Sequence, residues 1–340
     1  MKSLLVTGAA GFIGSHLLDR ILSNNLATLV AVDNFNDFYD PKIKRSNVAQ
    51  HWTTNGFHFH EADITSWDDM AAICGHNRFD CIVHLAAYAG VRPSLERPLL
   101  YERTNVRGTY LLLELARHFG IPKFIFASSS SVYGRNSRVP FSESDRTDHI
   151  VSPYAATKLA GEVASRLYSH LYGMRVVCLR FFTVYGARQR PDLAIHKFSR
   201  SIWHGIPIQL FGDGTSSRDY TYIDDIIDGI LAAVDYDDSP FEVINLGGSQ
   251  PVELIRLVQL LEAGLSRKAV IEWMPEQPGD VPITYADISK ATRLLGYRPI
   301  TTFESGLDAF VSWFRDYALT NNREKIQNPS SRVSSHGPPA

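Results

Sequence analysis

A tyrosine and a lysine with the spacing of one helix face stand near the middle of the chain. Tyr154 and Lys158 are four residues apart and follow Pro153, in a segment whose apolar positions have helical spacing. Positive charge beside a phenol favours the phenolate. A phenolate can take the proton of a substrate hydroxyl while the carbon that bears this hydroxyl loses hydride. The serine run 128–131 offers a second hydroxyl, and we expect Ser129 or a neighbour to hold the same substrate oxygen.

The beginning of the chain contains a glycine-rich turn of the kind that binds dinucleotides. Gly8, Gly11 and Gly14 follow a strand-like run and precede a helix-like run. Glycine permits a tight turn there and lets a pyrophosphate approach the amides that begin the helix. Asp33 ends the second strand-like run, where its carboxylate can accept hydrogen bonds from both ribose hydroxyls of an adenosine. No Arg or Lys follows it directly, so we expect NAD and not NADP.

Two further features belong to this expected cofactor site. Asp63 follows the third strand-like run, where it either holds the adenine amino group or caps a helix. The positive nicotinamide ring of NAD would add to the charge of Lys158 in lowering the pKa of Tyr154.

Alternating strand-like and helix-like segments must position these residues. Such alternation is typical of βαβ units, so we expect an α/β fold with a Rossmann-type doubly wound parallel sheet. The expected strands are Ser3–Thr7, Thr28–Asp33, Phe57–Glu61, Asp80–His84, Lys123–Ser128 and Arg175–Arg180, and the expected helices are Phe12–Ser23, Trp67–Cys74, Pro98–Phe119 and Pro153–Tyr172.

The rhythm changes after residue 180, where segments become shorter and richer in Pro and Gly. We expect a NAD-binding Rossmann domain from residues 1–180 and 218–248, and a smaller C-terminal α/β lobe for the substrate from residues 181–217 and 249–319. Within the returning stretch, Asp224–Asp235 is expected to be helical and Glu242–Leu246 to be a strand. Residues 320–340 are polar, which predicts a disordered tail.

Composition argues against several other classes of protein. The net charge is −2, so neither nucleic acid nor an anionic membrane is an expected partner. No apolar run is long enough to span a bilayer. Cys74, Cys81 and Cys178 lack the spacing of a metal site or a disulfide framework. We therefore expect no metal, buried free thiols and a cytoplasmic location.

Longer runs of sequence resemble a known family. The chain is similar to the extended short-chain dehydrogenases/reductases, and within them to NAD-dependent nucleotide-sugar epimerases, most of all those that act on UDP-glucuronate. The matching runs are TGAAGFIGSHL from Thr7, DNFNDFYD from Asp33, HLAAYAGVRPSLERP from His84, SSSSVYG from Ser128, YAATK from Tyr154, LRFFTVYGARQRPD from Leu179, FGDGTSSRDYTYIDDI from Phe211 and QPGDVPITYAD from Gln277.

The resemblance implies roles for individual residues. It makes Tyr154, Lys158 and Ser129 catalytic and points to a UDP-sugar as the substrate. It extends the expected NAD contacts to Phe12, Ile13, Asn34, Ile64, Leu85, Ala86, Ala87, Asn105 and Ser128, beside Gly8, Gly11, Gly14, Asp33 and Asp63. It assigns the substrate to Arg92, Ser130, Thr183, Arg190, Arg218 and Asp280, together with Ser129 and Tyr154.

Sugar specificity depends on a few of these positions. Thr183 stands where the resembling UDP-galactose 4-epimerases have Asn, and it can donate to a C6 carboxylate. Arg190 is expected to reach the nucleotide end of the same pocket, and Arg92 either adds a cation near the cofactor or caps a helix in its loop. Two positions depart from the family pattern: Tyr88 replaces the usual glutamine, and Gln277 stands where many relatives have arginine.

The resemblance favours 4-epimerisation of UDP-glucuronate to UDP-galacturonate through a transient 4-keto sugar. A UDP-glucuronate decarboxylase and a UDP-glucose 4-epimerase are the alternatives. A 4,6-dehydratase is disfavoured, because such enzymes have Asp-Glu where this chain has Ser129 and Ser130. A silent NAD-binding protein would have lost the Tyr/Lys pair or the glycines. Relatives form homodimers through the two long helices, so we expect a homodimer here.

Overall fold

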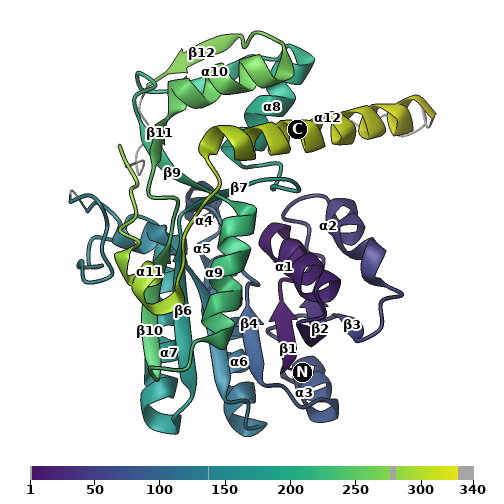
Figure 1. The fold of residues 1–340 in the computed structure, drawn as a ribbon, viewed down its shortest axis with the longest axis vertical. Coiled ribbons are helices and arrows are strands. Elements are labelled where there is room, and N and C mark those ends of the chain that lie inside the picture. Colours follow the sequence, from purple (N-terminus) through teal and green to yellow (C-terminus); the bar gives the residue numbers. More distant parts are fainter. Residues whose placement is uncertain (1, 137, 276–280, 328–340) are drawn as a thin grey trace, which may run out of the picture.

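A seven-stranded parallel sheet forms the centre of the larger lobe (Figure 1). The computed structural model describes residues 2–136, 138–275 and 281–327. The strand order is β10-β6-β5-β4-β1-β2-β3. From β1 the chain builds the sheet outward through β2 and β3, and from β4 it builds outward on the other side, so the topological switch point lies between β1 and β4. In such sheets ligands bind at the switch point, beyond the carboxyl ends of the strands. The strands are β1 (Lys2–Thr7), β2 (Ala27–Asp33), β3 (Phe57–Glu61), β4 (Cys81–His84), β5 (Lys123–Ser129), β6 (Arg175–Phe181) and β10 (Phe241–Leu246).

Helices cover both faces of this sheet, as a doubly wound fold requires. Leu4 and Val6 of β1 pack with α1 (Phe12–Ser23), α9 (Ile223–Asp235) and α11 (Ser289–Leu295). Leu5 points to the opposite face, where it packs in the core that includes α3 (Trp67–His76), α6 (Gly108–His118) and α7 (Pro153–Tyr172). This alternation follows from the two-residue period of a strand. The predicted Rossmann-type fold is confirmed.

A smaller lobe stands above the carboxyl ends of the strands (Figure 1). It contains a three-stranded sheet in the order β11-β9-β7 and a two-stranded sheet of β12 and β8. The strands are β7 (Thr183–Tyr185), β8 (Ile208–Phe211), β9 (Ser217–Tyr222), β11 (Pro251–Glu253) and β12 (Ile271–Met274), and the helices are α8 (Ala194–His204), α10 (Leu254–Leu265) and α12 (Phe303–Gln327). Their apolar faces form a separate core around residues such as Leu257 and Phe310.

Two expected boundaries are corrected by the structure. Strand β9 pairs with β7 and β11, so the chain returns to the large sheet with α9 at Ile223 and not at Arg218. Helix α12 continues to Gln327, so residues 320–327 are helical where a disordered tail was expected, and residues 328–340 lie outside the described part of the chain.

The expected single helix Pro98–Phe119 is divided into three pieces. Helix α5 (Pro98–Tyr101) leads into the π-helical segment η2 (Glu102–Arg107), and α6 follows. Asn105 lies within η2, and its carboxamide bonds to both the amide and the carbonyl of Tyr88, each at 2.9 Å. The wider turn places this side chain against the strand-end loop, a tertiary contact that apolar periodicity does not reveal.

Short segments complete the cover of the larger lobe. They are α2 (Pro41–Val48), α4 (Val91–Glu96), and the 3-10 turns η1 (Ala49–His51) and η3 (Ser130–Tyr133). The three cysteines are buried and free, as expected. Among the described helices, none combines the length and apolar character needed to cross a membrane.

Candidate active site

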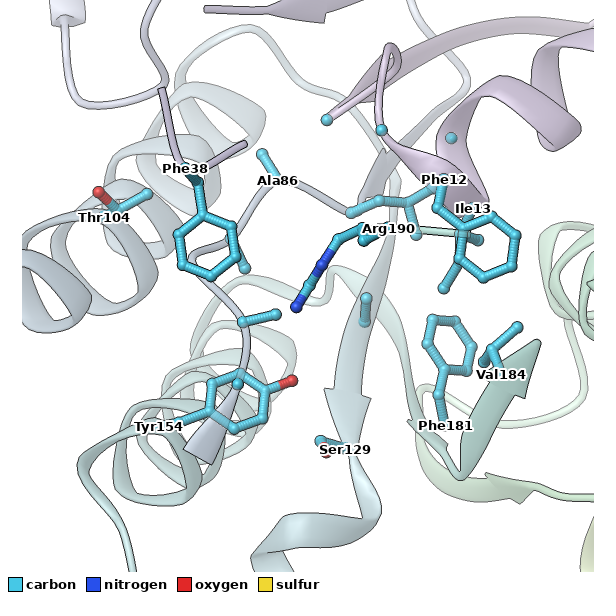
Figure 2. Close-up of a pocket in the computed structure, with 18 of the residues that line it drawn as sticks. Phe12, Ile13, Phe38, Ala86, Thr104, Ser129, Tyr154, Phe181, Val184 and Arg190 are labelled. Carbon is cyan, nitrogen blue, oxygen red and sulfur yellow. The ribbon is translucent and has the colours of Figure 1, made fainter. Parts of the chain in front are cut away.

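A cavity of about 450 Å³ lies at the carboxyl ends of the large sheet, beneath the smaller lobe. Figure 2 shows the Tyr154 hydroxyl and the Arg190 guanidinium both directed into it. Its wall includes the following predicted residues: Gly8, Gly11, Phe12, Ile13, Gly14, Asp33, Asn34, Ile64, Leu85, Ala86, Ala87, Ser128, Ser129, Ser130, Tyr154, Lys158, Thr183 and Arg190. Segments far apart in the sequence therefore meet as the motifs predicted.

The glycine turn brings the backbone of α1 to the cavity. Gly8 has φ of 70°, and a Cβ atom there would lie 2.6 Å from the amide nitrogen of Ala86. A Cβ at Gly14 would lie 2.8 Å from the Cα of Ala9. The N-cap residue Gly11 offers no side-chain cap to the first amides of α1. Those amides and the helix dipole can therefore hold a pyrophosphate.

Asp33 is placed to hold the ribose of an adenosine. Its two carboxylate oxygens accept hydrogen bonds from the amides of Ala10, at 3.1 Å, and Phe35, at 2.9 Å. Burial raises the pKa of Asp33, while the charge of Lys44 and the two amides oppose that rise. Each carboxylate oxygen has a further lone pair for a hydroxyl donor. The turn and this carboxylate together fit a dinucleotide.

Lys44 lines the same cavity and was missed from the sequence. Its ammonium donates to the Asn36 carbonyl oxygen at 2.9 Å and to the Asn36 side-chain oxygen at 2.8 Å. The expectation for NAD considered only the residues directly after Asp33, whereas Lys44 lies further along the chain and α2 brings it back to the cavity. Other lining residues that were missed are Phe38, Tyr39, Thr104, Ser131, Phe181, Val184 and Leu193.

Two predicted cofactor residues lie behind the cavity wall. Asp63 accepts hydrogen bonds from the Thr65 amide at 2.8 Å and from the Asn34 side chain at 3.1 Å. Burial acts to raise the pKa of Asp63, but these hydrogen bonds outweigh burial and hold it below its ordinary value. Asn105 is buried and, besides Tyr88, donates to the Thr157 hydroxyl at 3.0 Å. Neither residue lines the cavity. Asp63 instead hydrogen-bonds Asn34, and Asn105 hydrogen-bonds the backbone of Tyr88, so both support loops at the cavity.

The catalytic side chains come together at the start of α7. Ser152 caps this helix by accepting a hydrogen bond from the Ala155 amide at 3.1 Å, which fixes the first turn that carries Tyr154. The Ser129 side chain lies close enough to the Tyr154 side chain to favour the ionised form of the phenol. One turn further along, the Lys158 ammonium donates to the Ala127 carbonyl oxygen at 2.8 Å. The predicted catalytic group is assembled.

Electrostatics at this group differ in part from the expectation. Burial raises the pKa of Tyr154, and the nearby Ser129 hydroxyl and the charge of Arg190 offset only part of that rise. Burial also lowers the pKa of Lys158 to about 7. Burial thus opposes both the phenolate of Tyr154 and the ammonium of Lys158. A phenolate at Tyr154 therefore depends on charge that a bound ligand brings.

Ser128 has a different function from its neighbours. Its hydroxyl donates to Glu162 at 2.5 Å, and Glu162 forms a buried ion pair with Arg180 at 2.8 Å. The Ser128 hydroxyl proton is engaged by Glu162, so the Ser128 oxygen can only accept a hydrogen bond from a ligand. The Ser129 hydroxyl donates to the Ser131 hydroxyl at 3.1 Å, so it must rotate to donate to a ligand, whereas the Ser130 and Ser131 hydroxyls also line the cavity.

A cation stands opposite the catalytic tyrosine. Arg190 forms two hydrogen bonds with Asp192, at 3.0 and 2.7 Å, and its guanidinium lies over the Phe38 ring, 5.1 Å from the ring centre. Figure 2 shows this guanidinium near the Phe38 ring. Thr183 also lines the cavity.

The structure does not bring every predicted substrate residue into the cavity. Arg92 is exposed on α4, with its guanidinium 5.0 Å from the centre of the Phe211 ring. Arg218 lies on β9 and donates to the Ser217 carbonyl oxygen at 3.0 Å. Both are absent from the wall described above. Asp280 lies outside the described residues.

Known proteins resemble the chain over almost its full length. Residues 4–247 match the NAD dependent epimerase/dehydratase family. The UDP-glucuronate 4-epimerase of Thermodesulfobacterium geofontis is 42% identical over 319 residues, which cover 93% of this chain and 97% of that protein.

Solved structures agree with this similarity. The UDP-glucuronic acid 4-epimerase of Bacillus cereus, in complex with UDP-glucuronic acid and NAD, superposes with a TM-score of 0.87 at 37% identity, covering 93% of this chain and 99% of that one. The UDP-glucose 4-epimerase of Thermotoga maritima, with UDP-glucose, gives a TM-score of 0.85 at 32% identity over the same shares of the two chains. The chain, with its glycine turn and its Tyr154–Lys158 pair, therefore belongs to the NAD dependent epimerase/dehydratase family.

Proposed function

We propose that this protein converts UDP-glucuronate to UDP-galacturonate by NAD-dependent epimerisation at C4. One observation carries the proposal: a single cavity joins a dinucleotide turn, the Ser129–Tyr154–Lys158 group and the Arg190 cation. The relatives named as UDP-glucuronate 4-epimerases support the choice of sugar.

Each catalytic side chain has a task that its position allows. The glycine turn and Asp33 would hold NAD, which would supply a reversible hydride acceptor for C4 of the sugar. Ser129 holds the C4 oxygen, and Tyr154 takes its proton and later gives it back. Lys158 lies one turn along the same helix face, where its ammonium can hold a ribose hydroxyl. Because the hydride returns, the reaction has no net redox change.

Retention of the carboxylate is the specific difficulty of this reaction. Oxidation at C4 makes a β-keto acid, which can lose CO2. Thr183 can donate a hydrogen bond to the carboxylate, and Arg190 adds a cation to the same cavity. Holding the carboxylate in a fixed orientation disfavours decarboxylation while the keto sugar rotates.

Product identification tests the proposal. Purified protein with NAD is incubated separately with UDP-glucuronate, UDP-glucose and UDP-N-acetylglucosamine, and the nucleotide sugars are separated by chromatography. We expect UDP-galacturonate from the first substrate, without CO2. UDP-xylose or a UDP-4-keto-pentose with CO2 would indicate a decarboxylase, and turnover of UDP-glucose alone would indicate the 4-epimerase that acts on neutral sugars. Tyr154→Phe provides the control for activity that belongs to this site.

The protein is also proposed to act as a homodimer in the cytoplasm. Three apolar side chains at one-turn spacing on α7 are exposed: Val163 by 61%, Leu167 by 44% and Leu171 by 56%. Tyr110 on the adjacent α6 is 40% exposed. A second copy would cover this apolar face. The three buried free thiols support a reducing compartment.

Light scattering tests the dimer. A mass of twice 38.1 kDa at micromolar concentration is expected, and Leu167→Glu should reduce it to that of one chain. Lys268→Glu changes an ammonium on an exposed side chain of the smaller lobe and should leave the dimer intact. A wild-type monomer would refute the assembly.

A further inference from the structure

The segment between β7 and α8 forms one wall of the cofactor cavity. Arg190 and Leu193 of this segment line the same cavity as Gly8 and Gly14 of the glycine turn. The segment follows a strand of the smaller lobe, whereas the turn belongs to the large sheet. Whatever fixes this segment to the large lobe therefore also fixes the width of the cavity.

Arg188 makes that connection. It has φ of 59°, in the left-handed region that a residue with a Cβ adopts only when other contacts hold it there. Its guanidinium forms an ion pair with Asp19 on α1, and the two side chains are 17% and 29% exposed. A second nitrogen of the guanidinium donates to the Asn47 carbonyl oxygen on α2 at 3.4 Å. An arginine of the smaller-lobe segment thus reaches two helices of the large lobe.

The partner side of this contact is itself well anchored. Asp19 also accepts hydrogen bonds from His51 at 2.6 Å and from Gln50 at 2.8 Å. The Asn47 side chain donates to the Ala10 carbonyl oxygen within the glycine turn at 3.0 Å. His16 on α1 also contacts the segment, because its Nε2 atom lies 2.9 Å from the Ala187 carbonyl oxygen and 3.3 Å from the Arg188 Nε atom. Arg188 therefore binds α1 and α2, the two helices that contact the glycine turn.

The other side of the segment is fixed to α8. The Gln189 side chain donates to the Val184 carbonyl oxygen at 3.1 Å and accepts from the His196 amide at 3.2 Å. The His196 ring donates to the Gln189 carbonyl oxygen at 2.7 Å. Gln189 thus holds the segment to the smaller lobe and Arg188 holds it to the large lobe, while Arg190 enters the cavity next to both.

We infer that Arg188 and Asp19 form a latch that keeps the dinucleotide bound during turnover. The inference rests on the proposed function, because an epimerase must keep the reduced cofactor until hydride returns to the sugar. With the latch closed, the wall that carries Arg190 stays against the glycine turn. With the latch open, the wall can move with the smaller lobe and the dinucleotide can leave.

Cofactor exchange measures the latch without any sugar. Holoenzyme is charged with radiolabelled NAD and chased with excess unlabelled NAD, and the label that remains bound is followed by rapid gel filtration. Arg188→Ala is expected to release label about tenfold faster than wild type, the scale of one charge-assisted hydrogen bond. Asp19→Ala should do the same, and the double variant should release label no faster than the faster single variant.

Arg20→Ala is the matched control. Arg20 lies next to Asp19 on α1 but pairs with Asp224 and Asp228 of α9 and not with the segment between β7 and α8. It should retain label as wild type does. Equal release by Arg188→Ala and wild type, equal acceleration by Arg20→Ala, or additive effects of the two latch substitutions would each overturn the inference.

Two precautions keep the test decisive. If Arg188→Ala does not fold, as judged by its Tm, Arg188→Lys replaces it, with an acceleration expected because the planar fork is lost. A wild-type release rate in Arg188→Lys would then overturn the latch. Because no sugar is present, a wrong sugar assignment leaves the result unchanged, and the product assay on wild type tests the proposed function separately.

Discussion

Lys158 carries a charge whose burial has a measurable cost in the protein without cofactor. The residue is 4% exposed, and its ammonium donates to the Ala127 carbonyl oxygen. Burial lowers the pKa of Lys158 from 10.5 to about 7. Methionine has a similar length and no charge, so Lys158→Met removes this cost together with one hydrogen bond.

The sign of the effect follows from proton binding. Folded protein releases the Lys158 proton near pH 7, whereas the unfolded chain keeps it until about pH 10.5. Between these values the unfolded chain binds more protons, so the free energy of unfolding of wild type rises with pH. The rise from this group amounts to about 2.7 kcal/mol between pH 6 and pH 9. Below pH 7 the full cost remains, roughly 5 kcal/mol.

Urea unfolding of the two cofactor-free proteins at pH 6, 7, 8 and 9 measures this difference. At pH 6 we expect Lys158→Met to be the more stable protein, because a lost hydrogen bond costs only about 1 kcal/mol. Its advantage should shrink by about 2.7 kcal/mol by pH 9. All other titrating groups are common to both proteins, so their effects cancel. A difference that stays constant with pH to within about 0.5 kcal/mol would refute the buried charge.

Three further substitutions test the site. Tyr154→Phe should lower kcat by about 10²- to 10⁴-fold while NAD stays bound, since it removes only proton transfer; near-normal turnover would contradict that role. Arg190→Met should raise KM for UDP-glucuronate by roughly tenfold and increase the CO2 released per turnover, as measured with carboxyl-labelled substrate, and an unchanged CO2 fraction would separate Arg190 from the carboxylate. Gly14→Ala should lower the free energy of unfolding by about 1–3 kcal/mol and weaken NAD binding, because its Cβ would lie 2.8 Å from the Ala9 Cα; wild-type NAD affinity by calorimetry would contradict the close approach.

Local patterns in the sequence were enough to predict the architecture of the large lobe. Its strands are short apolar runs, and their burial on both faces makes them recognisable without tertiary information. The segment Pro98–Phe119 shows where this ends. Apolar spacing predicted one helix, but Asn105 is drawn to the backbone of Tyr88, and the chain forms a π-helical turn there. Sheet membership of β9 likewise depends on a partner strand that no local pattern identifies.

Motifs whose parts are close in sequence predicted their part of the site correctly. Tyr154 and Lys158 share a helix face whatever the rest of the chain does, and the glycine turn needs only a strand before it and a helix after it. Lys44 shows the opposite case. It enters the cavity because α2 folds back over Asp33, and nothing in its spacing from Asp33 reveals that path.

The sequence by itself determined that the chain has a dinucleotide turn and a tyrosine–lysine pair, because each is contained in one turn or one helix. Only the tertiary structure decided which cations meet that pair. Arg190 enters the cavity and Arg92 and Arg218 do not, since their positions depend on how the smaller lobe packs over the large sheet. The structure also showed that burial, acting on Tyr154 and Lys158 alike, leaves the phenolate to be stabilised by bound ligand. Burial is set by packing between distant segments, and local spacing carries no measure of it.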